Sequence, residues 1–519
     1  MASVLPPSRP PGRDRRPGPM TTADPAVAST VLERYEAVIG IEVHCQLRTA
    51  SKMFCRCSTD YEGAPPNSHV CPVCLGLPGA LPVINRRAVE HVLTTGLAID
   101  ATIPPATRWD RKNYFYPDLP KGYQISQYDL PLASSGRLAF ETSAGPVSVG
   151  ITRAHLEEDT AKLIHTTGSD GQKVSLVDFN RSGAPLMEIV TDPDVRTAEQ
   201  ARRYAEELQA LLRSIGASDA DMERGQMRVE ANVSLRPRGA EAFGTRVEVK
   251  NMNSFRSVER AIAFEIERQA AALDAGERLV QETRGWHEDR GATYRMRVKE
   301  SSDDYRYFPE PDLPPLHLDP GWLDELRSRL PELPAARRER YRSRFGLSAY
   351  DASVIVGNRN AETLLETLIA AAIGAKEAAN WVSGEYLRLL RKYGEGDVPH
   401  LRAEDLGVEL ASLVGLVASG QITRTNAKEV FETHFTSGES TAAIIESRGL
   451  RQISDRSTVT AAVDAVLASN PAAVADVRAG RAQAIGFLVG QVMKATRGQA
   501  NASVVQAAIR ERLDAGEEV

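Results

Sequence analysis

The stretch Ile39-Gly-Ile-Glu42-Val-His44-Cys-Gln46-Leu47 alternates polar and apolar side chains. Successive side chains of an extended strand point to opposite faces, so the pattern predicts a strand with Glu42, His44 and Gln46 on one face. The other face is apolar and belongs in a hydrophobic core. A glutamate and a histidine on a buried-looking strand are costly unless a positive group lies against them. The polar face is therefore a candidate site.

Acidic residues recur in similar patterns further along the chain, in His155-Leu-Glu157-Glu158-Asp159, Pro185-Leu-Met-Glu188, Arg228-Val-Glu230-Ala-Asn232 and Arg246-Val-Glu248-Val-Lys250. Carboxylates and an imidazole suit Mg²⁺ or Mn²⁺. Interleaved cations, which include Arg153, Arg181, Arg246 and Lys250, indicate phosphate beside the metal. The pattern of any one strand alone is equally consistent with a solvent-exposed face of a sheet, but five such strands together favour a shared cation site. Neither a P-loop nor a Rossmann glycine motif is present.

The order of these patterns predicts an α+β protein with a large antiparallel or mixed sheet. Strand patterns lie between residues 35 and 308, with helices over 197–215 and 254–275. A proline-rich segment at 308–315 ends this cradle domain, which we place at 35–315. We expect a helical linker domain at 316–400 and an all-α tail at 401–519. Residues 1–34 form a proline- and arginine-rich arm that we expect to be disordered, with Met1 or Met20 as the start.

Four of the five cysteines fall within 20 residues, as Cys55-Arg-Cys57 and Cys71-Pro-Val-Cys74. Two such pairs across a short loop favour a structural zinc site with four thiolate ligands. Reduced thiols without metal and disulfides are the alternatives. The fifth, Cys45, adjoins His44, but neighbours on a strand face opposite ways, so we interpret Cys45 as a small buried hydrophobe.

Composition excludes several classes of protein. Lys plus Arg is 63 against 69 Asp plus Glu, a net charge of −6, so a uniformly basic nucleic-acid coat is excluded. The few cysteines indicate a reducing compartment. The longest apolar stretch, Thr363 to Ala375, is interrupted by Glu366 and is too short to span a bilayer. We therefore expect a soluble, cytoplasmic protein with no membrane contact.

Several long motifs resemble the GatB family of tRNA-dependent amidotransferase subunits. They are Gly40-Ile-Glu42-Val-His44, the cysteine segment continuing to Pro82, Asn113-Tyr-Phe-Tyr-Pro to Ser126, His155 to Asp159, Asp178 to Gly183, Glu248 to Phe255 and Asp304 to Pro309. The match runs from about residue 35 to the C-terminus. Gly490 to Gly498 resembles the YqeY-like tail of the family.

The resemblance implies an ATP-dependent amidation of Glu mischarged on tRNA(Gln), Asp mischarged on tRNA(Asn), or both. The side-chain carboxylate is phosphorylated, and ammonia then displaces the phosphate. The ammonia comes from the glutaminase subunit GatA, with GatC as the third subunit. The resemblance further implies a cradle similar to the glutamine synthetase catalytic fold, with ATP, Mg²⁺ and structural Zn²⁺ as cofactors.

Site residues follow from matching positions in the family motifs. The metal cradle comprises Glu42, His44, Glu157, Glu158 and Glu188, with Glu230 and Glu248 as further candidates. The family more often has Asp where this chain has Glu230. Arg181, Lys250 and Arg306 would face phosphate, and Lys250 is also counted with the catalytic groups. Asn180, Asn251 and Asn253 would orient substrate. Lys112, Tyr114 and Tyr116 lie in the motif associated with the ammonia path.

Charge favours the tail as the tRNA contact. Residues 478–512 hold six basic side chains, including Arg481, Lys494 and Arg497, against one acid, Glu511. With no base-reading motif, we expect recognition by shape. The run Arg337 to Arg344 has similar charge, but arginine-rich helices are commonly just solvated. A stand-alone ligase and a non-catalytic zinc-bearing tRNA scaffold are the competing interpretations of the whole chain.

Overall fold

The computed structural model describes residues 31, 33–298, 305–394, 402–451, 456–479, 481, 483–496 and 500–514. The expected disordered arm falls almost entirely outside the described residues, as do both candidate start positions. The chain divides into two compact units, residues 1–335 and 336–519.

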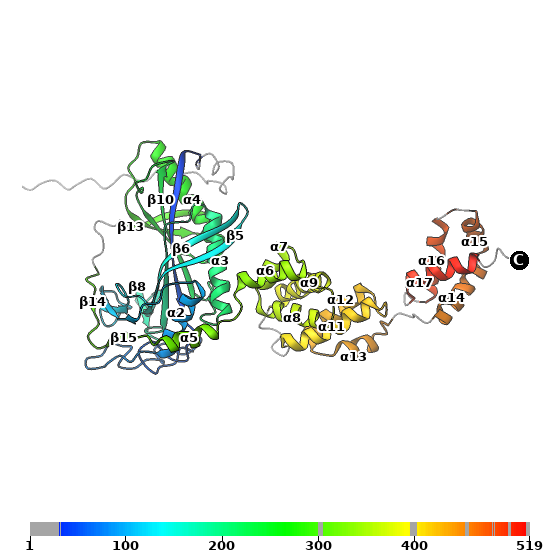
Figure 1. Ribbon diagram of the computed structural model, residues 1–519, viewed down its shortest axis with the longest axis horizontal. Helices are drawn as coiled ribbons and strands as arrows, with labels where there is room; N and C mark the ends of the chain where they lie inside the picture. Colours follow the sequence, from blue (N-terminus) through cyan, green and yellow to red (C-terminus); the bar gives the residue numbers. More distant parts are fainter. Residues whose placement is uncertain are drawn as a thin grey trace, which may run out of the picture. The chain divides into compact units, whose positions relative to one another are not determined.

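The first unit is built on an eight-stranded mixed sheet with the order β13-β12-β11-β10-β1-β9-β6-β5 (Figure 1). Its neighbours pair antiparallel except β11 and β12, which run parallel. The opening motif forms the central strand β1, between β10 and β9. The strand bounds are β1 (Tyr35–Gln46), β5 (Ala133–Thr142), β6 (Gly145–Glu158), β9 (Pro185–Thr191), β10 (Met227–Pro237), β11 (Val247–Met252), β12 (Glu282–His287) and β13 (Ala292–Val298).

Helices cover one face of this sheet, where α3 (Ala198–Ser214) contacts α4 (Phe255–Asp274) (Figure 1). Thr197 and Ser254 cap their N-termini, because each side chain accepts a hydrogen bond from a backbone N–H of the first turn. Both helices match the expected ranges. The apolar side chains of β1 are fully buried in the core beneath them, as predicted, together with α2 (Arg86–Ala98). The polar side chains of β1 consequently lie on the opposite face.

Smaller elements surround the main sheet. One three-stranded sheet has the order β14 (Phe308–Pro309), β3 (Asp110–Asn113), β4 (Tyr123–Ser126). Two further pairs are β15 (Leu316–His317) with β2 (Ala106–Thr107), and the hairpin β7 (Lys162–Thr167) with β8 (Lys173–Asp178). Helix α5 (Pro320–Ser328) buries Leu326 in the core of the first unit. The boundary expected at 315 therefore lies about 20 residues later, because α5 and the segment after it still pack on the sheet domain.

The second unit is helical in its described parts and contains two separate hydrophobic cores. The first core spans residues 341–445, so the boundary expected near 400 divides a single core. Its elements are α6 (Pro334–Phe345), α7 (Ala349–Val356), α8 (Arg359–Ala370), α9 (Ala375–Trp381), the π-helical turn η1 (Val382–Tyr386), α10 (Leu387–Tyr393), α11 (Ala403–Ala418), α12 (Arg424–Ser437) and α13 (Thr441–Ser447). The packing of α11 on α8 explains the correction, since the two helices lie on either side of residue 400.

The second helical core spans residues 459–513 and is formed by four helices (Figure 1). Val459 and Val463, which are four residues apart on one helix, are fully buried in it. The helices are α14 (Arg456–Ser469), α15 (Pro471–Arg478), α16 (Gln483–Ala495) and α17 (Ala502–Asp514). Within the described residues no single helix is long and apolar enough to cross a membrane, although the bent pair Ser457–Ser469 and Pro471–Arg478 meets those criteria together. The α+β fold class is confirmed.

Candidate cation-binding and catalytic site

Strand register brings the acidic residues together on the face of the sheet away from α3 and α4. Glu42 on β1 lies opposite Glu230 on β10, and His44 on β1 lies opposite Glu188 on β9. Glu188 also lies opposite His155 on β6. Like charges directly across a ladder destabilise a sheet unless a cation separates them. The register therefore concentrates negative charge at two neighbouring places along β1.

The first place is the His44 group, which we define as His44, Glu157 and Glu188. One ligand atom from each lies within 4.8 Å of the others. His44 Nε2 is 3.4 Å from Glu188 Oε2. A second imidazole joins them, since His155 Nε2 lies 3.0 Å from Glu157 Oε1 and 3.4 Å from Glu188 Oε2. With His155 beside the group, two imidazoles thus contact its two carboxylates.

Charge coupling within the His44 group shifts its titration. Burial opposes the charged form of His155, but Glu188 and Glu157 outweigh it and raise the pKa of His155 to about 9. Burial likewise opposes ionisation of Glu188, yet His155 and His44 hold its pKa well below the usual range. The Nδ1 atoms of both histidines are buried without a hydrogen-bond partner among the described residues.

The second place is the Glu42 group, which we define as Glu42, Glu230 and Glu248. Its ligand atoms also lie within 4.8 Å of one another. Lys250 already neutralises part of it, with Nζ 2.8 Å from Glu230 and 3.2 Å from Glu248. Burial, followed by the charges of Glu188 and Glu230, raises the pKa of Glu42. Asn232 Nδ2 donates to Glu42 Oε1 at 2.8 Å. Lys250 and Asn232 therefore already contact all three carboxylates of this group.

Both groups have donors that a hard cation prefers, namely carboxylate oxygens and, in the His44 group, imidazole nitrogen. The fit is better in the His44 group, because only one of its described cationic contacts is short, the one at 3.0 Å between His155 Nε2 and Glu157 Oε1. The two histidines stand 3.4 Å from Glu188 Oε2, and Arg153 Nη2 stands 3.8 Å from Glu188 Oε1, so a divalent ion there would replace mostly long contacts. In the Glu42 group it would compete with the Lys250 ammonium.

Lys112 and Tyr114, predicted for the ammonia path, lie beside the His44 group. Burial opposes the charge on Lys112, but Glu157 and Glu188 outweigh it and raise the pKa of Lys112. The Tyr114 hydroxyl donates to Gln124 Oε1 at 3.3 Å, and Gln124 Nε2 donates to Glu157. A polar chain therefore connects Tyr114 to the metal-competent group. Tyr116, by contrast, is exposed at the surface.

Three predicted residues lie away from both acidic groups. Glu158 follows Glu157 on β6 and so points to the other face, where its Oε1 pairs with Lys121 Nζ at 2.5 Å and accepts from the Ile125 N–H. Asn180 accepts from His69 N–H and donates to Pro65, which anchors the cysteine loop. Arg181 donates to the Thr160 and Ala161 carbonyls. Each of these side chains thus contacts loops in this structure, and the expected metal, substrate and phosphate roles stay predictions.

The remaining predicted polar residues are Asn251, Asn253 and Arg306. Asn251 follows Lys250 with a left-handed φ of 65°, and its Nδ2 donates to the Tyr294 hydroxyl at 3.4 Å. Asn253 is exposed. Arg306 also has a left-handed φ, 44°, and its carbonyl accepts from Asn113 Nδ2 at 2.7 Å. Their roles toward phosphate and substrate stay predictions.

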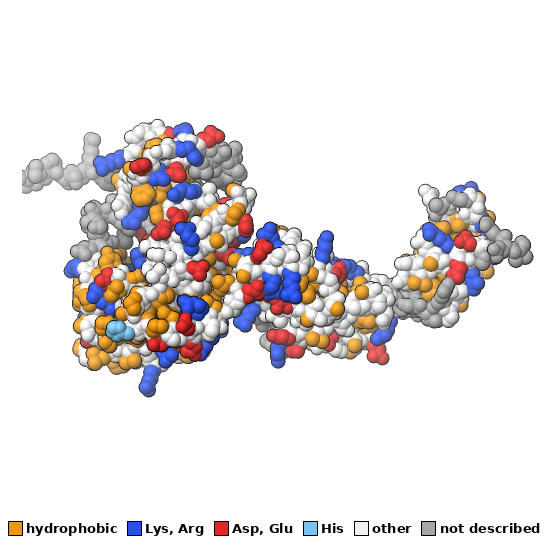
Figure 2. Space-filling model, viewed as in Figure 1, with side chains coloured by type: hydrophobic (Ala, Val, Ile, Leu, Met, Phe, Trp, Pro, Cys, Tyr) orange, Lys and Arg blue, Asp and Glu red, His pale blue; other side chains and the backbone are white. Residues whose placement is uncertain are grey.

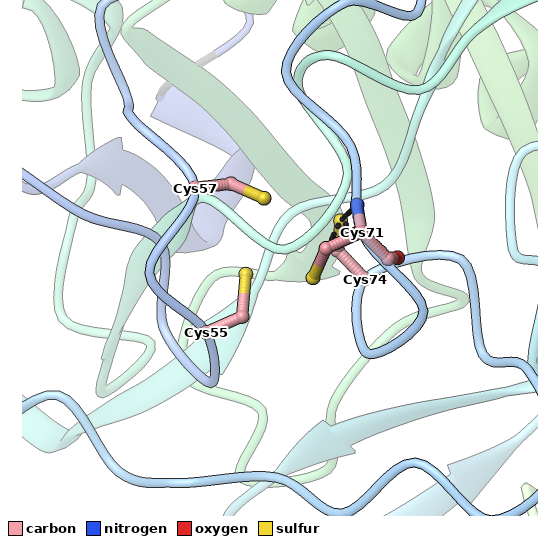
Figure 3. A group of neighbouring side chains, drawn as sticks. All are labelled: Cys55, Cys57, Cys71 and Cys74. Carbon is pink, nitrogen blue, oxygen red and sulfur yellow. Dashed lines mark hydrogen bonds between the residues drawn. The ribbon is translucent and has the colours of Figure 1, made fainter.

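The four clustered cysteines converge from two loops (Figure 3). Their sulfur atoms all lie within 4.8 Å of one another, and Cys71 Sγ is 3.9 Å from Cys74 Sγ. A tetrahedral zinc with bonds of about 2.3 Å sets its sulfurs about 3.8 Å apart. All five cysteines are free of disulfides. The geometry fits a metal bound by thiolates better than a disulfide.

Electrostatics at the cysteine cluster also favour a thiolate. A hydrogen bond from Cys55 is the largest influence and, with the Cys71 amide and Lys52, lowers the pKa of Cys74 to about 4 against burial. Cys45, in contrast, is fully buried in the sheet core, where burial raises the pKa of its thiol to about 12. The interpretation of Cys45 as a buried hydrophobe is supported.

Sequence reasoning missed two members of the site. His155 contacts both Glu157 and Glu188. The period of two along its strand could have placed it on the same face as Glu157. Gln124 bridges Tyr114 and Glu157, but the contact joins remote segments and had no local signal.

Basic side chains in the helical unit are partly paired within the chain. Figure 2 shows Lys and Arg gathered over α6, yet Arg337 pairs with Glu362 and Arg340 with Glu366. In the tail, Arg481 pairs with Asp476 at 2.5 Å and Arg512 with Asp464 at 2.9 Å. The net charge counted over residues 478–512 thus overstates the positive electrostatic field of the tail, because that range leaves out the acids Asp464 on α14 and Asp476 on α15. Lys494 is on α16, and Arg497 lies outside the described residues.

The sheet and its two acidic groups define an α+β protein with a carboxylate-lined candidate site whose side chains could hold a metal ion. Family comparisons agree with this class. The GatB/GatE catalytic domain matches residues 37–324, and a GatB–YqeY model described as the GatB domain matches residues 363–513. The chain belongs to the GatB family, and the resemblance of its tail to YqeY is confirmed.

Several relatives carry the name of one subunit of the aspartyl/glutamyl-tRNA(Asn/Gln) amidotransferase. One from Moorella thermoacetica is 52% identical over 92% of this chain and 100% of its own length. One from a Roseiflexus species is 52% identical over 92% of this chain and 98% of its own. One from Dehalococcoides mccartyi is 48% identical over 93% of this chain and 100% of its own.

Proposed function

We propose that this chain carries out an ATP-dependent amidation of Glu-tRNA(Gln), Asp-tRNA(Asn) or both, as one subunit of an amidotransferase. The observation that carries the proposal is the pair of acidic groups on one sheet face, with Lys112 and Lys250 beside them. The names of the similar proteins support the substrate class. Carboxylates that gather cations suit a reaction in which phosphate charge must be neutralised.

The chemistry needs two steps. An oxygen of the substrate's side-chain carboxylate attacks the γ-phosphorus of ATP, and the bond to ADP breaks to leave an acyl phosphate. Ammonia then attacks the acyl carbon, the bond to phosphate breaks, and the nitrogen loses a proton to give the amide. Phosphorylation is required because a carboxylate oxygen is otherwise a poor leaving group.

Mg²⁺ would be held by the His44 group, where it would neutralise the phosphates of ATP. Lys250, fixed between Glu230 and Glu248, would offer a second, permanent positive charge toward phosphate. Lys112 and the chain from Tyr114 through Gln124 to Glu157 would guide ammonia to the acyl group. We keep Asn251, Asn253 and Arg306 as candidates for orienting substrate.

Other parts of the chain would support this reaction. The four cysteines would bind structural zinc, and the tail would contact tRNA. GatA and GatC would be the partner subunits, with GatA hydrolysing glutamine to supply ammonia. We place the reaction in the reducing cytoplasm because all five cysteines are free of disulfides.

The decisive experiment measures ATP hydrolysis coupled to amide formation in the complex with GatA and GatC, with Glu-tRNA(Gln) or Asp-tRNA(Asn) as substrate. Product on one tRNA and not on the other would establish the activity and its specificity together. Without GatA, we expect product from added ammonium but none from glutamine.

The competing scaffold function predicts tRNA binding without chemistry. We therefore compare the wild type with Glu42→Gln and His44→Ala, two changes on the polar face of β1. The proposal requires loss of amide formation with folding and tRNA binding intact. Retained amidation in either variant contradicts the metal-cradle assignment, and absence of product in the wild type with tRNA still bound favours the scaffold.

A further inference from the structure

A completely buried lysine lies beside the cysteine cluster. Lys52 has none of its surface exposed, and its Nζ is 2.8 Å from the His69 carbonyl oxygen, 3.3 Å from the Phe179 carbonyl oxygen and 3.7 Å from Cys74 Sγ. An ammonium has three hydrogen-bond donors, so these contacts use them all. These three contacts therefore fix the position of the Lys52 ammonium.

A buried ammonium needs an anion, since carbonyl oxygens satisfy its hydrogen bonds but not its charge. Within the part of the chain that the structure describes, no carboxylate lies at ion-pair distance from Lys52. Glu158 lies close to the Lys52 stem, since its Oε2 would be 4.0 Å from a Cβ at Gly183, but its carboxylate pairs with Lys121. Cys74 Sγ is the anionic group that contacts Lys52 Nζ. A neutral thiol would not balance the charge, whereas a metal-bound thiolate would.

The backbone around Lys52 fixes it to the cluster. The Lys52 N–H donates to the Cys57 carbonyl, which closes the first cysteine loop. A Cβ at Gly183, whose φ is +82°, would come 3.4 Å from Cys74 Cβ and 3.7 Å from Lys52 Cδ. The lysine stem and the second cysteine loop thus pack closely against the segment before β9.

We propose that Lys52 is the internal counter-ion of the cysteine-bound metal, and that its charge sets how tightly the metal is retained. Four thiolates around Zn²⁺ carry a net charge of −2. A fixed ammonium at Cys74 offsets part of that charge inside the protein, where solvent cannot. Lys52 is a positioning residue, and its role rests on the proposed zinc site.

The test uses the full chain under reducing conditions, with zinc content and the rate of zinc release to a chromogenic chelator as readouts. Lys52→Met removes the charge and keeps most of the volume. We expect zinc release to be 10- to 100-fold faster, the range typical of lost outer-shell contacts to a metal. Arg56→Met is the matched control, because Arg56 is an exposed cation between Cys55 and Cys57, and it should release zinc at the wild-type rate.

A second variant separates charge from hydrogen bonding. Lys52→Gln keeps an N–H donor, on a stem one bond shorter, but carries no charge, so it should also lose zinc faster. A wild-type release rate in Lys52→Gln, or equal acceleration in Arg56→Met, overturns the counter-ion role. If both variants are insoluble, excess zinc should restore folded protein by mass action, and failure to do so also overturns it. A wild type without metal would instead refute the zinc site itself.

Discussion

At the scale of single residues, neighbours in the sequence have different surroundings. Glu157 contacts His155 within the His44 group, whereas Glu158 pairs with Lys121 on the other face of β6. Burial alone does not distinguish them, since both are nearly inaccessible. The direction of each side chain therefore decides which acid can bind a cation.

This difference yields a prediction for the pair. Glu157→Gln should lower the apparent affinity for Mg²⁺ in ATP hydrolysis by about 100-fold, because it removes a charged ligand from the His44 group. Glu158→Gln should leave Mg²⁺ affinity within about twofold of the wild type, since its carboxylate does not reach that group. The measurement is a Mg²⁺ titration of ATP hydrolysis in the assembled complex. Equal weakening by the two changes would contradict the assignment.

Local pattern predicted the polar face of β1 and the cysteine cluster well, because period-two alternation and short loops are local properties. It could not assign Asn180 and Arg181, whose hydrogen bonds are to loops distant in sequence or to local carbonyls instead of to the acidic groups. Family motifs group such residues together without saying which of them hold loops in place.

At the scale of elements, α10 and α12 are joined through one glutamate. Glu432 on α12 bonds Lys392 at 2.6 Å, the Tyr393 hydroxyl at 2.7 Å and Arg388 at 2.9 Å. The hydrogen bonds from Lys392, Tyr393 and Arg388 lower the pKa of Glu432 to about 2. The contact links segments on either side of residue 400 and so adds to the packing between them.

Glu432 makes this part of the stability pH-dependent. Because its folded pKa is depressed, the stabilisation is fully present above the ordinary glutamate pKa of about 4.5 and is lost as the pH falls toward about 2. Glu432→Gln should cost about 1 kcal/mol of unfolding free energy at pH 6 and close to nothing near pH 2. Urea unfolding of both proteins at several pH values measures the difference. A difference that does not shrink on acidification would contradict the contact's role.

At the scale of the whole molecule, the described residues form three hydrophobic cores that follow one another in sequence, and the last belongs to α14–α17. Proline-rich and glycine-rich segments indicated boundaries near 315 and 400, but α5 packs back on the sheet domain and α11 packs on α8. Composition marks where the chain turns, whereas core packing decides where a domain ends. A cut at residue 410 would fall inside α11 and break the middle core.

A chain ending at Arg451 should therefore remain folded, because the first two cores are complete without the remaining residues. It should bind mischarged tRNA at least about tenfold more weakly at physiological salt, since the basic tail is gone, and its affinity should fall less steeply with salt. Residues 456–514 hold seven basic and four acidic side chains, so the positive electrostatic field of the tail is modest. Lys494→Glu should therefore weaken tRNA binding by a smaller factor than removal of the whole tail. Binding titrations across salt concentrations measure both effects, with circular dichroism to confirm folding. If the shortened chain is folded and binds tRNA as tightly as the full chain, the tRNA contact must lie on the parts of the protein built on the first two cores.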